Sequence, residues 1–286
     1  MDFAVIGGDM RQAKLAEFFA ADGNSVGIYG LGNLEIQGVK VFSSLEEALK
    51  ARYVVLPLPA TEANILNTPM CNESIKICDL FSMTEPGKTI FLGKATGEIW
   101  ESAQNARIHI VDYFDREELV VRNAATTAEG AIQILMEELT VALWDTRCLV
   151  MGFGRIGKLL ALKLRALGAR VTVSARKFSD FAWIEACGYE YAAHQELEKI
   201  LGDFDVIVNT IPARVLDEEK IRLLKEDCLC LDLASKPGGI DFAAAAKLNV
   251  KAIWTLSLPG RVAPVTSGAV IKDAIYNIIS ELEGET

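Results

Sequence analysis

Short apolar runs alternate with amphipathic stretches over about the first 120 residues. The runs "FAVIGG", "SVGIYG", "YVVLPLP", "KICDLF" and "TIFLGK" are almost continuously apolar, which is typical of strands buried on both faces. Arg11–Ala21 shows the mixed pattern of a helix instead. Strands that alternate with helices in this way predict a parallel sheet with helices on both faces.

A long helix is predicted at 123–145, between the two halves of the chain. Apolar residues recur there at intervals of three and four from Ile132 to Leu143. Thr126 and Glu129 have the spacing of a capping box, in which each side chain satisfies a free backbone N–H group at a helix start. We therefore expect the helix to begin near Thr126.

The alternation of strands and helices repeats over 146–267. Strands are predicted at "CLVMGFG", "RVTVSA", "DVIVNTIP", "CLCLDLAS" and "KAIWTLS". The last segment, 268–286, predicts a helix whose apolar face packs back on the first domain, 1–122. The expected fold class is α/β, with two doubly wound, Rossmann-like parallel-sheet domains joined by a long hinge helix.

Charge and composition exclude several functions. The net charge of −10 argues against a general nucleic-acid binder, which needs clustered cations. The six cysteines lack the spacing of a metal site, so no metal is expected. No apolar run approaches the length of a membrane span, so we expect a soluble, cytoplasmic protein. His109 and His194 belong to no serine or cysteine motif, so nothing points to acyl transfer.

Gly152, Gly154 and Gly157 form a GxGxxG motif directly after the apolar run "CLVM". In this context the first glycine permits a tight turn, the second lets the backbone approach a pyrophosphate, and the third lets helix and strand pack closely. Arg155 and Ile156 open the following helix, whose free N–H groups would hold the phosphates. The motif predicts a dinucleotide-binding site.

The segment "VTVSARK" stands where an NAD-binding domain usually carries an acid for the ribose hydroxyls. Ser174, Arg176 and Lys177 are found there instead. An acid would repel a 2′-phosphate, whereas arginine can bind it bidentately and serine can donate a hydrogen bond to it. We therefore predict NADP rather than NAD. The alternative is that both cations lie in a solvated loop with no ligand.

Further candidates follow other strands of this domain, because ligands bind at the carboxyl ends of parallel strands. Those expected along the cofactor are Thr210, Pro212, Ala234 and Ser235. Lys236 comes next, in a Pro-Gly-Gly turn, and Arg261 lies in "LPGRVAPVTSG", which predicts a stiff loop of the kind that often carries function. Near the N-terminus, "IGGDMRQ" places Arg11 after a Gly-Gly turn without the third glycine, so no second nucleotide site is expected there.

Five segments together resemble one family over nearly the whole chain. "IGGDMRQ", "DYFDREELVVRNAATTAEGAI", "GFGRIG", "LDLASKPGGIDF" and "LPGRVAPVTSG" are similar to the A subunit of dipicolinate synthase. The domain arrangement also resembles the 2-hydroxyacid and alanine dehydrogenase group. The resemblance implies an NADP-linked oxidoreductase that oxidises a cyclic, partly reduced pyridine dicarboxylate from the lysine pathway to dipicolinate during sporulation. It also implies a partner, the separately encoded B subunit of dipicolinate synthase, together with a homo-oligomer and the mother-cell cytoplasm of a spore former.

A dicarboxylate needs cations or helix N-terminal N–H groups for both of its charges. We expect Arg261 to be the main carboxylate clamp and Thr127, at the predicted helix start, to receive the other carboxylate. Arg11 and Lys236 would line the same site, and Glu129 is the candidate base that removes a proton from the ring.

Two alternatives stay open. One is a reductase of 2-keto acids on the same fold, although the histidine that such enzymes carry late in the chain is missing after His194. The other is a nucleotide-binding subunit without chemistry of its own. Turnover by the purified chain distinguishes them.

Overall fold

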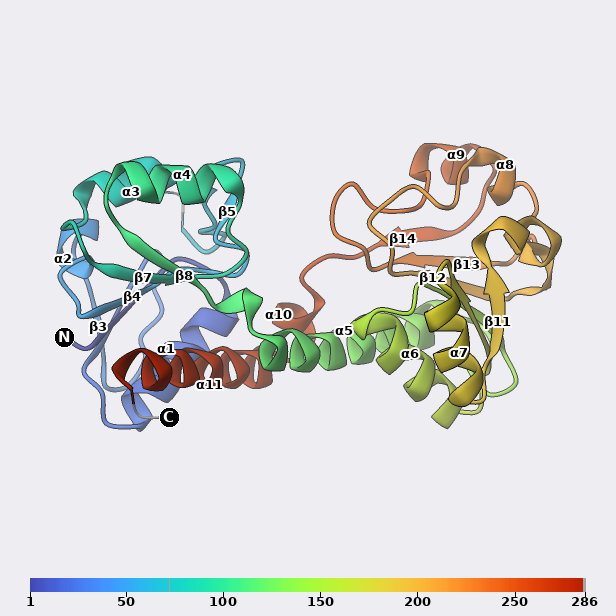
Figure 1. Cartoon of the computed structure of the whole chain (residues 1–286), viewed down its shortest axis with the longest axis horizontal. Helices are drawn as coiled ribbons and strands as arrows, with labels where there is room; N and C mark the ends of the chain where they lie inside the picture. The colour runs from blue at the N-terminus through green and yellow to red at the C-terminus, as the bar shows by residue number, and fades with distance from the viewer. Residues whose placement is uncertain (72, 285–286) are drawn as a thin grey trace. The chain divides into compact units, whose positions relative to one another are not determined.

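The computed structural model describes residues 1–71 and 73–284. The chain forms two compact units. Unit 1 is Met1–Asn123 with the segment from Ala263 onward, and unit 2 is Ala124–Val262. Each unit contains one six-stranded parallel sheet, as Figure 1 shows, so the expected α/β class with two parallel-sheet domains is confirmed. Residues 285–286 of the helix expected at 268–286 lie outside the described residues.

The sheet of unit 1 has the strand order β3-β2-β1-β4-β7-β8. Counted along the chain, this is the order 3-2-1-4-5-6 of dinucleotide-binding sheets. A small antiparallel hairpin, β5 with β6, lies outside the sheet. The strands are β1 Phe3–Ile6, β2 Val26–Tyr29, β3 Val39–Val41, β4 Tyr53–Val55, β5 Thr61–Glu62, β6 Ile65–Leu66, β7 Thr89–Leu92 and β8 His109–Asp112.

Helices cover both faces of this sheet. In Figure 1, α3 and α4 lie on one face and α1 and α11 on the other. α1 and α11 approach closely, because a Cβ on Gly268 of α11 would lie 2.8 Å from the Arg11 carbonyl oxygen. The helices of this unit are α1 Met10–Ala21, α2 Leu45–Ala48, α3 Ile77–Met83, α4 Gly97–Asn105, the 3-10 helix η1 Tyr113–Asp115 and α11 Pro264–Glu283.

The strand expected at "KICDLF" is wrong, because this segment is helix α3. Ile77, Leu80 and Phe81 of α3 are buried, at the i, i+3, i+4 spacing of one helix face. A short apolar run does not distinguish a buried strand from a buried helix, and here the packing of α3 on the sheet selects the helix.

Unit 2 repeats the same topology, with the order β11-β10-β9-β12-β13-β14. In Figure 1, α6 and α7 lie on one face of its sheet and α8 and α9 on the other. The strands are β9 Arg147–Met151, β10 Arg170–Ala175, β11 Glu190–Ala193, β12 Val206–Asn209, β13 Leu229–Asp232 and β14 Ala252–Trp254. The helices are α6 Arg155–Ala166, α7 Phe178–Ala186, the 3-10 helices η2 His194–Lys199 and η3 Leu201–Asp203, α8 Glu218–Ile221, α9 Phe242–Lys247 and α10 Leu258–Val262.

The long helix α5 spans Glu117–Glu138, so it begins and ends earlier than the expected 123–145. The predicted start at Thr126 is wrong, because the helix already begins just after the 3-10 helix η1. Leu143 kept the helical spacing in the sequence, but it is a buried residue of the unit 2 core on the segment that leads to β9. Thr126 is therefore an interior helix residue and not a cap.

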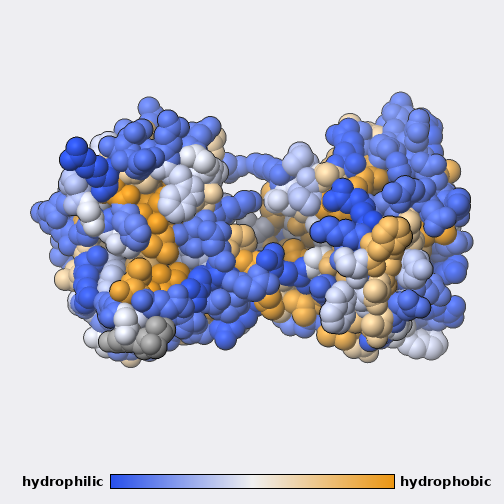
Figure 2. All heavy atoms as spheres, in the orientation of Figure 1, coloured by the Kyte–Doolittle hydropathy of each residue, from blue (hydrophilic) through white to orange (hydrophobic). Residues whose placement is uncertain are grey.

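Apolar clusters lie on both faces of each sheet, as expected for strands that are apolar throughout. Figure 2 shows polar residues over much of the visible face of both units, with apolar residues gathered in patches between them. Among the described residues no helix combines the length and the apolar character that crossing a bilayer requires.

Candidate dinucleotide-binding site

The glycine turn follows β9 at the carboxyl end of its sheet. Gly152 has a φ of +99°, a conformation that favours glycine. A Cβ on Gly157 would lie 2.1 Å from the Gly152 carbonyl oxygen, so a larger residue would not fit. A Cβ on Gly154 would meet no described atom within 4 Å. Each glycine thus has the backbone surroundings that the spacing predicts, and the open side of the turn is at Gly154.

Helix α6 begins at this turn. Its N-cap is Gly154, and in the described chain no side chain caps its first N–H groups. Arg155 and Ile156 occupy its first turn, as expected. An N-terminus without a side-chain cap combines N–H groups with the positive end of the helix dipole, which is the arrangement that binds phosphate groups.

Ser174, Arg176 and Lys177 lie at the carboxyl end of β10, the strand beside β9. Ser174 is fully buried, and its hydroxyl has no hydrogen-bond partner among the described residues. Arg176 and Lys177 are exposed, and their side chains form no hydrogen bond or ion pair within the described chain. This corner of the sheet is therefore basic and holds donors that the protein itself does not use.

His194 borders the same corner and was not recognised from the sequence. It follows β11, in which Ala193 stands opposite Ala175 of β10. The His194 ring is hydrogen-bonded to the backbone of Ser174, and its Nε2 is buried without a partner in the described residues. Burial, and then the charge of Arg176, lower the pKa of His194 below its ordinary value. Strand pairing brings these residues together, and one local sequence pattern does not reveal it.

Asp232 organises the loop after β13 and was also missed. Its buried carboxylate accepts hydrogen bonds from Asn209 Nδ2 at 2.7 Å, Ala234 N at 3.0 Å and Gly239 N at 2.6 Å. These bonds hold the segment that contains the predicted residues Ala234, which is buried, and Ser235, which is exposed. A polar residue at the end of each of two apolar strands, "DVIVN" and "CLCLD", was the available sequence signal.

Thr210 and Pro212 follow β12, as expected. The Thr210 hydroxyl donates to the Met151 carbonyl oxygen at 2.8 Å, so it ties β12 to the glycine turn. A Cβ on Gly152 would lie 2.5 Å from this hydroxyl oxygen. Thr210 therefore shapes the turn, and Pro212 is exposed beside it in the chain.

The predicted substrate residues come from different parts of the fold. Arg11 belongs to unit 1, whereas Thr127, Glu129, Lys236 and Arg261 belong to unit 2. Arg11 is buried and forms an ion pair with Asp9 at 2.8 Å, and its Nη2 also donates to the Leu58 carbonyl oxygen at 2.6 Å.

Two roles expected of α5 need correction. The capping box is wrong, because Thr126 and Thr127 are buried in the helix interior. Backbone N–H groups there bond within the helix, so they cannot receive a substrate carboxylate. The Glu129 side chain forms an ion pair with Lys163 of α6 at 2.8 Å instead of reaching back to a cap.

The loop expected at "LPGRVAPVTSG" is wrong as well, because the segment forms α10 and the start of α11. Pro264 stands in the first turn of α11, a position that suits proline because its missing N–H would have no partner there. Arg261 is exposed on α10, and its Nη1 donates to Thr255 Oγ1 at 3.2 Å. Lys236 is exposed after β13.

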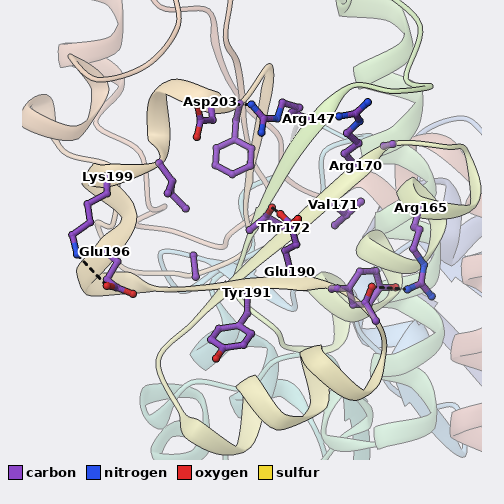
Figure 3. Close-up of a pocket in the computed structure, with 16 residues that line it drawn as sticks. Arg147, Arg165, Arg170, Val171, Thr172, Glu190, Tyr191, Glu196, Lys199 and Asp203 are labelled. Atoms are coloured by element: carbon purple, nitrogen blue, oxygen red, sulfur yellow. Dashed lines mark hydrogen bonds and ion pairs between the residues drawn. The ribbon is translucent and has the colours of Figure 1, made fainter.

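A separate hollow of about 550 Å³ opens along β10 and β11 (Figure 3). Arg147 and Arg170, at the amino ends of β9 and β10, help to line it. Arg170 forms an ion pair with Asp145 at 2.6 Å, and Lys199 with Glu196 at 3.1 Å. Because ligands of such sheets bind at the carboxyl ends of the strands, this hollow is not the dinucleotide site.

Comparisons with known proteins agree with both units. A family described as the N-terminal domain of the A subunit of dipicolinate synthase matches residues 2–114. A family described as "D-isomer specific 2-hydroxyacid dehydrogenase, NAD binding domain" matches residues 118–234. The second unit therefore carries a nicotinamide dinucleotide-binding domain of the dehydrogenase type.

The A subunit of dipicolinate synthase from Bacillus subtilis (strain 168) is 29% identical over 290 residues, which cover 100% of this chain and 98% of the relative. The chain is similar to this A subunit over its whole length. The crystal structure of the Bacillus subtilis protein superposes with a TM-score of 0.87, covering 100% of this chain and 98% of that one. The structure of the A subunit from Bacillus halodurans has a TM-score of 0.87 and 28% identity, with 98% of this chain and 97% of that one covered.

Together, the dehydrogenase-type domain and the full-length similarity support an oxidoreductase that uses a nicotinamide dinucleotide. The predicted resemblance to the A subunit of dipicolinate synthase is confirmed. The choice between NAD and NADP, the substrate and the roles of single residues stay predictions.

Proposed function

We propose that the chain is the NADP-linked subunit of a dipicolinate synthase. Its substrate would be a cyclic dihydro or hydroxytetrahydro pyridine dicarboxylate, which it oxidises to dipicolinate. Full-length similarity to the A subunit of dipicolinate synthase supports the reaction. The observation that carries the cofactor choice is the end of β10, where unpaired Arg176 and Lys177 and the orphan hydroxyl of Ser174 replace an acid.

The reaction removes one hydride and one proton from a dihydropyridine ring. When bound, NADP supplies the hydride acceptor at its nicotinamide. Arg261 and Lys236 are exposed cations of unit 2 and are proposed to hold the substrate carboxylates, with Arg11 as a further candidate in unit 1. Glu129 is proposed as the base, and it must leave Lys163 to accept the proton.

The name of the relatives, which marks them as one of two kinds of chain in the synthase, supports the B subunit of dipicolinate synthase as partner. We propose that both chains act in the cytoplasm of a spore former as part of a larger assembly. The test is turnover of the purified chain with the precursor made enzymatically from the lysine pathway and dipicolinate followed by its ultraviolet absorbance. We expect NADP-dependent product, whether the B subunit is present or not. No product under either condition would rule out the proposed reaction.

Two further measurements separate this proposal from its alternatives. NADP should bind at least tenfold more tightly than NAD, a difference of about 1.4 kcal/mol. The Arg261→Ala variant should lose dipicolinate formation while it keeps NADP binding, and unchanged turnover would remove Arg261 from the site. Product that forms only when the B subunit is present, with nucleotide bound by the chain alone, would identify a nucleotide-binding subunit without chemistry of its own.

A further inference from the structure

Two orphan polar atoms gather at the carboxyl ends of β10 and β11. In the described chain, three buried side-chain atoms lack a hydrogen-bond partner, namely Gln12 Nε2, Ser174 Oγ and His194 Nε2. Nearly all buried polar groups in proteins are paired, so each exception needs an explanation. Gln12 lies in unit 1, whereas Ser174 and His194 are joined by the hydrogen bond from the His194 ring to the Ser174 backbone.

The pairing of the strands defines where this corner lies. Ser174 stands opposite Ala192, and Ala175 opposite Ala193, so His194 is the next residue of the β11 side and Arg176 the next residue of the β10 side. The charge of Arg176 acts on the His194 ring. In a dinucleotide-binding sheet the adenosine ribose is held at this end of the second strand.

We propose that His194 determines specificity for the adenosine 2′-phosphate, together with Arg176 and Ser174. The proposal rests on the NADP binding proposed above. Arg176 can bind two phosphate oxygens, the Ser174 hydroxyl can donate to one, and an imidazolium at His194 can donate through Nε2 while its other nitrogen stays bonded to the Ser174 backbone. The orphan atoms become paired when the exposed Arg176 side chain turns with the incoming phosphate.

The charges around His194 make its protonation depend on the ligand. Without ligand, burial and the Arg176 charge favour the neutral ring. A phosphate dianion offsets the Arg176 charge and favours the imidazolium. The neighbouring elements β10, β11 and η3, and η2 itself, carry the other ionisable groups, which are Arg170, Glu190, Tyr191, Glu196, Glu198, Lys199 and Asp203. None of these is a cause of the pKa shift of His194, whereas Arg176 is.

The test uses two probes that differ at the 2′-position, adenosine 2′,5′-bisphosphate and adenosine 5′-monophosphate. Calorimetric titration of the full chain should show the bisphosphate binding more tightly. In the His194→Gln variant the bisphosphate should bind about tenfold more weakly and the monophosphate equally well. From about pH 7 to 9, where the phosphate is already dianionic, bisphosphate affinity should fall in the wild type and stay level in the variant.

His109→Gln is the matched control, because His109 is the other histidine and is exposed in unit 1. It should leave both affinities unchanged. It also assigns the ring signals in proton NMR, so the wild type can be tested even when His194→Gln does not fold. The His194 pKa should rise on adding the bisphosphate and not on adding the monophosphate.

Three outcomes would overturn the proposal. Equal weakening of both probes by His194→Gln would reduce His194 to a structural role. An unchanged bisphosphate affinity, or a His194 signal that ignores the bisphosphate, would remove His194 from the site while leaving NADP binding intact. Equal wild-type affinity for the two probes would instead contradict NADP specificity itself.

Discussion

The two units share one strand order, yet their first turns are arranged in opposite ways. In unit 1, Asp9 is the N-cap of α1 and completes a capping box with Gln12. A Cβ on Gly8 would lie 2.4 Å from the Gln12 side-chain oxygen, so the turn is filled. In unit 2, the N-cap Gly154 has open space around it.

The difference separates topology from ligand binding. In unit 1, a carboxylate of the chain occupies the helix N-terminus where a phosphate would otherwise bind, and its negative charge would repel one. In unit 2, the helix N-terminus has no such side chain in the described residues. The same sheet therefore supports a dinucleotide site in unit 2 and favours a self-capped, structural turn in unit 1.

The largest expected effect comes from giving unit 2 the cap of unit 1. Gly154→Asp should weaken NADP and NAD binding alike by about a hundredfold, or about 2.7 kcal/mol, because the new carboxylate occupies the phosphate position. Thermal stability should not fall, since aspartate is a favourable N-cap. Gly154→Ser, which caps without charge, is the control with a smaller loss. Unchanged affinities in Gly154→Asp would place the phosphates elsewhere.

The reverse change removes the cap of unit 1. Asp9→Asn should lower the free energy of unfolding by about 2 kcal/mol, because Arg11 stays buried without its partner charge. Denaturation of the full chain measures this. Nucleotide affinity should stay the same. Glu17→Gln, which breaks an exposed ion pair with Lys14 on the same helix, is the control and should have no measurable effect on stability.

The stability difference between wild type and Asp9→Asn should depend on pH. Burial opposes ionisation of Asp9, but the hydrogen bonds and charge of Arg11 prevail, so its folded-state pKa lies below the ordinary value of 3.8. The stabilisation is therefore complete above that value and is lost as the pH falls through the lower, folded-state pKa. A difference that persists unchanged below it would show that the charge of Asp9 is not the cause.

A smaller effect is expected from the basic corner of unit 2. Arg176→Ala should weaken NADP about tenfold and leave NAD unchanged, because only NADP carries the 2′-phosphate. Nucleotide titrations measure both. Arg107→Ala, at an exposed arginine of unit 1, is the control. A parallel loss of NAD binding would mean that Arg176 contacts a part common to both nucleotides.

The smallest effect is expected at Ser174. Ser174→Ala removes a buried hydroxyl that has no partner among the described residues, so stability should rise by up to about 1 kcal/mol. The preference for NADP over NAD should fall by about threefold, or about 0.6 kcal/mol. A stability loss instead would show that the hydroxyl is paired in solution, for example through water.

The sequence by itself determined the features that depend on local pattern. Near-continuous apolar strands predicted two parallel sheets, and the spacing of Gly152, Gly154 and Gly157 predicted a turn whose geometry the structure reproduces. Each of these requirements acts within a few residues, where sterics and side-chain periodicity leave few choices. The missing acid after β10 could be read for the same reason.

Only the tertiary structure decided which local signals were used. The spacing of Thr126 and Glu129 is that of a cap, but the helix starts earlier and Glu129 pairs with Lys163 of another helix. The groups around the 2′-phosphate corner and the Asp232 loop come together through strand pairing between residues about 20 apart in the chain. Such contacts are set by packing of the whole sheet, so no local window of sequence contains them.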